Sequence, residues 1–177
     1  MSDGTSPTRE QVLKRLMLAH QAYYDVFEQY PFEGRTFPVY AEFHTHGEQY
    51  VLVKRAKLWE VDSHEYLFFE SVARLTVDEL QELVDYMKER GIKKVNPVPN
   101  HMSSNLSLVI VADEIDDEAE QLLRKTRYRK NFAWGIRGWS DLRIGAVDLA
   151  RGVVLTNPAG KEMKPVLESN AFSPQDG

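Results

Sequence analysis

The stretch Leu106-Ser107-Leu108-Val109-Ile110-Val111-Ala112 decides the fold, because it is a nearly continuous apolar run bounded by polar residues. Its Val and Ile residues favour a β-strand. An apolar run that does not alternate with polar residues is typical of a strand buried on both sides. We therefore expect residues 106–112 to form a central strand that is covered on both faces.

Helices are predicted before and after this strand. Thr76 can cap the start of the first of them, and Glu79 completes a capping box. Gly91 lies where the residue that ends a helix commonly adopts the left-handed conformation. The second is predicted over about 115–129, with acidic residues at its start and basic residues at its end. That charge order complements the helix dipole, so it has a purely structural explanation.

The N-terminal part predicts one further helix. Thr8 and Gln11 form a capping-box pair, and apolar residues at three- and four-residue spacing continue to about residue 29. This pattern predicts a helix over about 8–29. His20 lies on its apolar side, where we expect a histidine at the edge of the core that is hydrogen-bonded to a neighbour.

From Val39 to Val72 the apolar period changes from helical spacing to two. The alternation predicts strands at 39–44, 50–58 and 66–69, joined by short links. Three successive strands with short links indicate an antiparallel meander.

The C-terminal part adds two or three strands, from the alternating residues 132–136 and the segments 143–149 and 153–156. The sequence thus predicts an α+β fold of order αβββαβαββ, with a mixed, largely antiparallel sheet and about three helices. We expect a single domain over 8–166, a disordered N-terminal tail over 1–7 and a flexible C-terminal tail over 167–177.

The alternative fold is a restriction-endonuclease-like αβββαβ core without its active site. Such nucleases need an acid on one strand and an acid-x-Lys triplet on the next. The predicted strand 50–58 has no acid before Glu60, and Glu70 is followed by Ser71-Val72 with no lysine. An active nuclease of that kind is therefore not expected, and fold analogy alone does not establish function.

Composition excludes several classes of protein. The 177 residues include no cysteine, which rules out disulfide scaffolds, thiolate zinc sites and cysteine nucleophiles. No apolar run approaches the roughly 20 residues that span a bilayer, and no cationic leader opens the sequence, so we expect a cytoplasmic protein without membrane contact. The 22 Lys and Arg against 27 Asp and Glu give a net charge of −5, which disfavours wholesale nucleic-acid coating but leaves room for a basic patch.

Glu42, His44 and His46 form the first candidate site. Residues two apart in a strand point the same way, so one carboxylate and two imidazoles would share a face. Two histidines and a carboxylate suit a divalent metal such as Fe(II) or zinc. A remote group would have to complete the set, with these candidates: His64, His101 and Asp148. The alternative is a polar strand face beside a turn at Gly47.

The second candidate site is the segment from Arg124 to Arg143, where seven positive charges stand against Asp141, a local charge of +6. Aromatic residues are interleaved with the bases, as in surfaces that neutralise phosphates and stack on bases. The candidate phosphate or nucleic-acid ligands are Arg127, Arg129, Lys130, Trp134, Arg137, Trp139 and Arg143. The alternative is an ordinary strand whose bases pair with the acids of the preceding helix.

Residues 130–143, Val147-Asp148-Leu149 and residues 156–161 resemble a small bacterial family of uncharacterised proteins, a domain of unknown function. The similarity runs from the first helix to about Val166. It implies no catalytic residues, but it does imply that Gly138-Trp139-Ser140-Asp141 and Arg143 matter for structure or binding.

These observations favour a cytoplasmic binding or interaction module without established catalysis. Exposed strand edges and 11% aromatic residues predict a homodimer. Two alternatives stay open. The protein could act on a phosphate-containing ligand, a nucleotide or nucleic acid, through the Arg127 to Arg143 surface, or it could be a His/Glu metal-dependent enzyme.

Overall fold

The computed structural model of the chain describes residues 5–44, 64–95, 104–132 and 138–173. Its helices and strands, in chain order, are α1 (Arg9–Gln21), β1 (Asp25–Phe32), β2 (Arg35–His44), β3 (His64–Leu75), α3 (Val77–Glu89), β4 (Ser104–Ile115), α4 (Asp117–Lys125), β5 (Arg129–Asn131), β6 (Trp139–Asp148), β7 (Val153–Thr156) and α5 (Lys164–Phe172). Two 3₁₀ turns, η1 (Gly91–Lys94) and η3 (Pro158–Met163), follow α3 and β7. None of the helices in these ranges combines the length and the apolar character needed to cross a bilayer.

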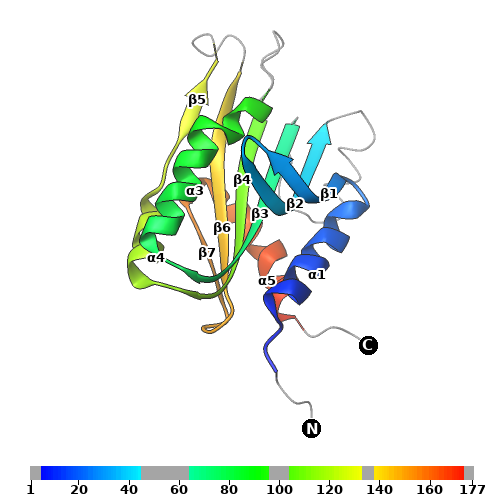
Figure 1. The fold of residues 1–177 in the computed structure, drawn as a ribbon, viewed down its shortest axis with the longest axis vertical. Helices are drawn as coiled ribbons and strands as arrows, with labels where there is room; N and C mark the ends of the chain where they lie inside the picture. The colour runs from blue at the N-terminus through cyan, green and yellow to red at the C-terminus, as the bar shows by residue number, and fades with distance from the viewer. Residues whose placement is uncertain (1–4, 45–63, 96–103, 133–137, 174–177) are drawn as a thin grey trace.

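Within the described residues, seven strands form one mixed sheet in the order β1-β2-β3-β4-β6-β5, with β7 also paired to β6 (Figure 1). The central strands β3, β4 and β6 run parallel, and the outer pairings are antiparallel. Helices α3 and α4 pack on one face of the sheet, and α1 and α5 pack on the other. The α+β class and the mixed sheet are therefore confirmed.

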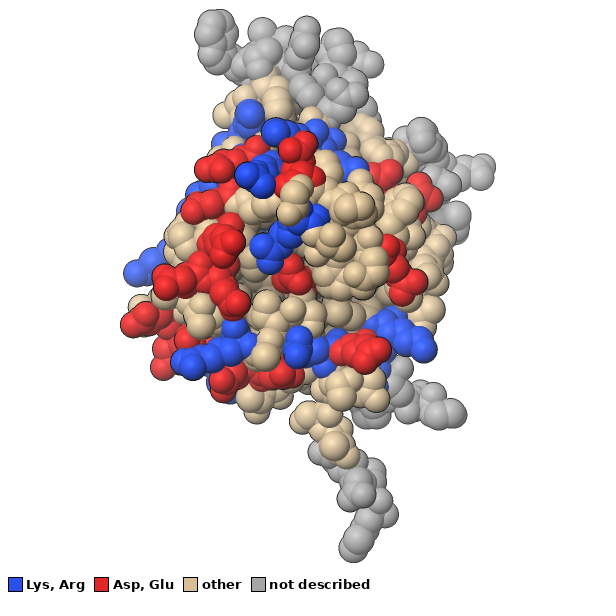
Figure 2. Space-filling view, viewed as in Figure 1, with Lys and Arg blue, Asp and Glu red and all other residues tan. Residues whose placement is uncertain are grey.

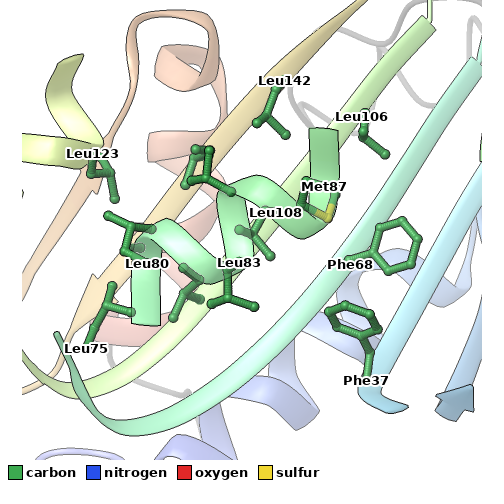
Figure 3. Close-up of a cluster of buried hydrophobic side chains, with 14 of the residues drawn as sticks. Phe37, Phe68, Leu75, Leu80, Leu83, Met87, Leu106, Leu108, Leu123 and Leu142 are labelled. Carbon is green, nitrogen blue, oxygen red and sulfur yellow. The ribbon is translucent and has the colours of Figure 1, made fainter. Parts of the chain in front are cut away.

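Strand β4 is the centre of this sheet, as the apolar run predicts. Nine consecutive residues, Ser104 to Ala112, are buried. Leu106 and Leu108 point toward α3, where they join a core that also contains Leu83 and Phe68 (Figure 3). Val109 and Val111 point the other way, into the core beneath α1 and α5. Covering both faces of β4 thus requires helices on both sides of the sheet.

The first helix is shorter than the predicted 8–29. Its start is confirmed, because the Thr8 hydroxyl accepts from the Gln11 amide at 3.1 Å and the Gln11 side chain accepts from the Thr8 amide at 2.9 Å. The helix ends at Gln21, and residues 25–32 form β1 instead. The helical spacing of Tyr24 and Phe27 arises by coincidence, since Tyr24 packs in the core beneath α1 and Phe27 stacks on Tyr40 across the sheet.

A three-stranded antiparallel meander is present, and the predicted strands 39–44 and 66–69 lie within β2 and β3, but its first strand is β1. Strands β1, β2 and β3 form it, with a tight turn at Glu33-Gly34, where both residues have positive φ. The predicted strand 50–58 lies outside the described residues. β3 runs over 64–75 rather than 66–69 because its polar ends continue the ladder with β2 and β4.

The chain remains packed beyond the predicted domain boundary at residue 166. Helix α5 continues to Phe172 and buries Val166, Leu167 and Ala171. Leu167 packs closely against Gly145 of β6. A Cβ atom added at Gly145 would lie 2.6 Å from Cδ1 of Leu167. The polar composition of residues 167–177 made this helix difficult to predict. Compared with the predicted order of elements, the observed order has an additional C-terminal helix and the short strand β5.

The described sheet edges give no support to the homodimer prediction. The outer strand β1 contains Pro31, which cannot donate a ladder hydrogen bond, and Gln29 with a φ of 48°. Pro, charge and irregular backbone on an edge strand hinder pairing with another chain. The opposite edge is formed by β5 and β7, which have only three and four residues. The exposed edges on which the dimer prediction depended are poorly suited to pairing.

Asn157 gives a structural role to the segment Thr156-Asn157-Pro158-Ala159-Gly160-Lys161, which takes part in the family resemblance. Its fully buried side chain donates from Nδ2 to the carbonyls of Thr126 (3.1 Å) and Leu142 (2.9 Å). Its Oδ1 accepts from the amides of Ile144 (2.8 Å) and Gly160 (2.9 Å). One amide group thus joins the end of α4, strand β6 and η3.

Replacing Asn157 by Ala should lower the free energy of unfolding by about 3 kcal/mol, because several buried backbone groups lose their partners. Asn157→Asp should also destabilise, since a carboxylate oxygen would face two carbonyls. The exposed Asn131 provides a matched control, and Asn131→Ala should change stability by under about 0.5 kcal/mol. Urea denaturation measures all three. A loss below about 1 kcal/mol for Asn157→Ala would contradict this role.

His20 is the buried histidine expected at the core. It is fully buried, its Nδ1 lies 2.6 Å from the Leu16 carbonyl, and its ring meets those of Tyr24 and Phe69 edge-on. Burial lowers the pKa of His20 from 6.5 to about 4, and the hydrogen bond to Leu16 opposes that shift. The fold therefore favours the neutral imidazole.

Because this pKa is lower in the folded than in the unfolded state, stability should fall as pH drops from about 6.5 to about 4. The contribution of His20 is about 3 kcal/mol, fully present above pH 6.5 and lost below pH 4. His20→Gln should flatten this part of the stability profile measured by urea unfolding. Equal slopes for wild type and variant between pH 7 and pH 4.5 would rule out the assignment.

Candidate functional site

The starts of β3, β4 and β6 are polar, whereas the middles of these strands are apolar. Their parallel register places Glu65 beside Asn105 and Asn105 beside Asp141. We call residues 64–66, 104–107 and 139–143 the polar end of the sheet. It lies away from both chain termini, at the top of Figure 1.

On the α1 and α5 side, the polar end holds a buried ion pair. The Arg143 guanidinium lies 3.7 Å from Oε1 of Glu65, with side chains 12% and 0% exposed. Asn105 is also buried and donates from Nδ2 to the same Glu65 oxygen at 3.0 Å. A charged pair and an amide thus lie on a sheet face that is apolar further along the strands, at Phe69 and Val109.

Ser107 adds a hydroxyl to this cluster. It is fully buried and lies beside Arg143 in the β4–β6 register. Within the described ranges, its Oγ has no hydrogen-bond partner. Buried polar groups nearly always have a partner, so an exception deserves a functional explanation.

The cluster continues outward along β5 and β6. Arg129 binds Asp141 with two hydrogen bonds, at 2.5 and 2.8 Å, and its guanidinium lies 5.4 Å from the centre of the Trp139 ring. Strand alternation and the β5–β6 register place Arg129, Trp139 and Asp141 on the same sheet face as Arg143. The exposed fraction of the side chains on this face therefore falls from 55% at Arg129 to 12% at Arg143.

The structure brings together only some of the predicted phosphate ligands. Arg129, Trp139 and Arg143 share one face, whereas Lys130 pairs with Ser140 in register and faces the opposite side. Arg127 lies exposed before β5. Trp134 and Arg137 lie outside the described residues.

Three of the bases of this segment pair with acids. Arg124 pairs with Glu120 at 2.8 Å, as the alternative interpretation of the charge pattern predicts, and Arg129 and Arg143 pair with Asp141 and Glu65. The face that carries α3 and α4 mixes basic and acidic side chains (Figure 2). The local charge of +6 therefore does not form a continuous basic surface on that face.

The predicted metal ligands Glu42 and His44 lie on the opposite face of the polar end, toward α3. Oε1 of Glu42 is 3.8 Å from Nε2 of His44, and Nδ1 of His44 is 2.9 Å from Nδ1 of His64. His64 is thus the remote group that joins them. No group of three His, Asp or Glu side chains within the described part of the chain is arranged to hold a metal ion.

The other predicted members of the metal set do not join this group. His46 and His101 lie outside the described residues. Asp148 lies at the far end of β6, where it accepts from the Ile115 amide at 3.2 Å and from Arg151 Nε at 2.7 Å. It therefore has a structural role.

A groove of about 960 Å³ lies at the other end of the sheet, beside the start of α1. Arg9 crosses it and donates to Ser71 at 2.8 Å and to Asp113 at 3.1 Å. Ligands of open α/β sheets often bind at this end. Here, however, Arg9 is already paired and the start of α1 is satisfied by its own capping box.

Sequence reasoning missed Glu65, Asn105 and Ser107. A signal was present in Asn105-Leu106-Ser107-Leu108, where polar residues alternate with apolar ones at the start of the central strand. That alternation predicts a polar row on one face. Glu65, in contrast, directly follows the polar residues Asp62-Ser63-His64, so no local pattern indicates that its side chain is buried.

Comparisons with known proteins identify a family but no function. No curated protein and no solved structure matches the chain, so the restriction-endonuclease-like alternative stays a prediction. One family model matches residues 8–169, from the cap of α1 into α5. The resemblance to an uncharacterised family is thereby confirmed, and the chain belongs to the family described as "Domain of unknown function (DUF8052)".

Proposed function

We propose that the protein is a binding module without catalysis of its own, and that it holds a small ligand with an anionic group at the polar end of the sheet. The observation that carries this proposal is the buried Glu65–Arg143 pair, with Asn105 and Ser107 beside it. We place the ligand on the α1 and α5 side.

Folding alone does not account for this cluster. A buried ion pair is often no more stabilising than apolar residues of similar volume, because both charges lose their hydration. The next row along the same face, with Phe69 and Val109, is apolar and fully buried. Buried charges that stability does not require are concentrated at functional sites.

The side chains indicate the class of ligand. The planar guanidinium of Arg143 suits a carboxylate or phosphate, and Glu65 and Asn105 can bind donor groups of the same molecule. Trp139 and Arg129 at the exposed margin can stack on a planar group. A small molecule fits better than a nucleic acid, because the bases on this face, Arg129 and Arg143, are each paired with an acid and form no row of unbalanced positive charge.

A cytoplasmic location and a homodimer remain parts of this proposal that rest on the sequence. Self-association would have to use a surface other than the edges formed by β1 and by β5 and β7. Sedimentation velocity would give the oligomeric state directly.

The ion pair can be tested for a folding role with a double-variant cycle. Glu65→Leu and Arg143→Met should each destabilise by about 3–5 kcal/mol, because each leaves one buried charge unpaired. The double variant should return to within about 1 kcal/mol of wild type in urea unfolding. As a control, Arg74→Met breaks an exposed pair with Asp116 at the other end of the sheet and should leave the unfolding midpoint unchanged. A double variant as unstable as the single ones would show that folding requires the pair.

Ligand binding can be tested by thermal shift at low salt with inorganic phosphate, a nucleoside monophosphate and an amino acid as probes. At least one probe should raise the Tm of the wild type in a salt-sensitive way. The shift should disappear in the Glu65→Leu/Arg143→Met variant and weaken in Arg129→Ala.

Two results would contradict the proposal. An equal shift in wild type and double variant would place the ligand elsewhere. A shift by a single-stranded oligonucleotide that is lost in Arg129→Ala and Lys130→Ala, but kept in the double variant, would favour the nucleic-acid alternative.

A further inference from the structure

The two histidines at the polar end stand directly opposite each other on β2 and β3. His44 pairs with His64 in the antiparallel register, their rings are 5.1 Å apart, and their Nδ1 atoms approach to 2.9 Å. They lie on the α3 side of the sheet, whereas Glu65 and Arg143 lie on the α1 and α5 side. An inference about the histidines is therefore independent of the proposed ligand site.

Glu42 lies beside Nε2 of His44, the ring nitrogen that faces away from His64. Its carboxylate faces Nε2 at 3.8 Å and is held by the hydroxyl of Tyr40, which donates to it at 2.8 Å. Burial, and next the hydrogen bond to Glu42, raise the pKa of Tyr40 far above its ordinary value, so this hydroxyl stays a donor. A carboxylate beside Nε2 favours a proton there, which leaves the Nδ1 lone pair of His44 facing His64.

We propose that Nδ1 of His44 and Nδ1 of His64 form a two-imidazole site for a divalent transition-metal ion such as Zn²⁺, with Glu42 as a positioning residue that acts through His44. Histidines that bind a metal commonly donate their other ring N–H to a carboxylate. This assignment differs from the set predicted from sequence, because Glu42 is not a ligand and His64 replaces His46.

Metal binding requires the two rings to separate and to turn. Zinc–nitrogen distances of about 2.0–2.1 Å at a tetrahedral angle put two ligand nitrogens about 3.3 Å apart. The Nδ1 atoms would therefore separate by about 0.4 Å from their present 2.9 Å, and each ring would turn by about 35°, because the two Nδ1 atoms now point at each other. His44 is 36% exposed, so its ring has room to move.

The protons balance in this step. In the neutral pair, His64 carries its proton on Nδ1 and donates it to His44. When the metal binds, that proton transfers through solvent to Nε2 of His64, and both Nδ1 lone pairs face the ion. Water completes the coordination, which makes the site open, unlike the closed four-ligand sites that hold structural zinc.

The test uses tag-free, full-length protein that has been treated with a chelator. Calorimetric titration with Zn²⁺ should give about one bound ion per chain, and Co²⁺ should produce the visible absorption of a low-symmetry complex. His44→Ala and His64→Ala should each weaken binding at least tenfold. Glu42→Gln should weaken it about 10- to 100-fold, as losing an outer-shell partner does, and Glu42→Asp should restore part of the loss.

His20→Gln is the matched control, because His20 lies on the buried side of α1 and should not affect the titration. The Tm of each variant without metal separates loss of binding from loss of folding. Absence of both heat and Co²⁺ absorption in the wild type would overturn the proposal. So would binding that survives His64→Ala but is lost in His46→Ala.

Discussion

The parallel alignment of β3, β4 and β6 is the constraint on which the rest of the structure depends. β4 is buried on both faces, so helices must cover both sides of the sheet. β3 and β6 pair with its two edges. The same register brings the starts of three strands, which are far apart in the sequence, into line. Glu65, Asn105 and Asp141 become neighbours only for that reason.

Strand alternation then divides the polar end into two chemically different faces. His64 and Glu65 are consecutive in β3 but point to opposite sides of the sheet. One face carries the ion pair with Arg143, and the other carries the imidazole pair with His44. A single rigid strand therefore supports two separate candidate sites, which mutations can distinguish.

Features with a local cause were predictable from the sequence. The central strand and the cap of α1 follow from short patterns, and the shared face of Glu42 and His44 follows from alternation. β1 was not predictable, because Tyr24 and Phe27 have helical spacing although they pack on opposite faces of the sheet. The Glu65–Arg143 pair joins positions 78 residues apart, and only the strand register brings them together.

Ligand binding at the polar end of the sheet can be mapped residue by residue. Backbone amide NMR spectra, recorded while small anionic and zwitterionic compounds are added, locate the binding site. We expect chemical-shift changes concentrated at the starts of β3, β4 and β6, around Glu65, Asn105 and Arg143. Shifts confined to the groove beside Arg9 at the start of α1 would contradict this expectation.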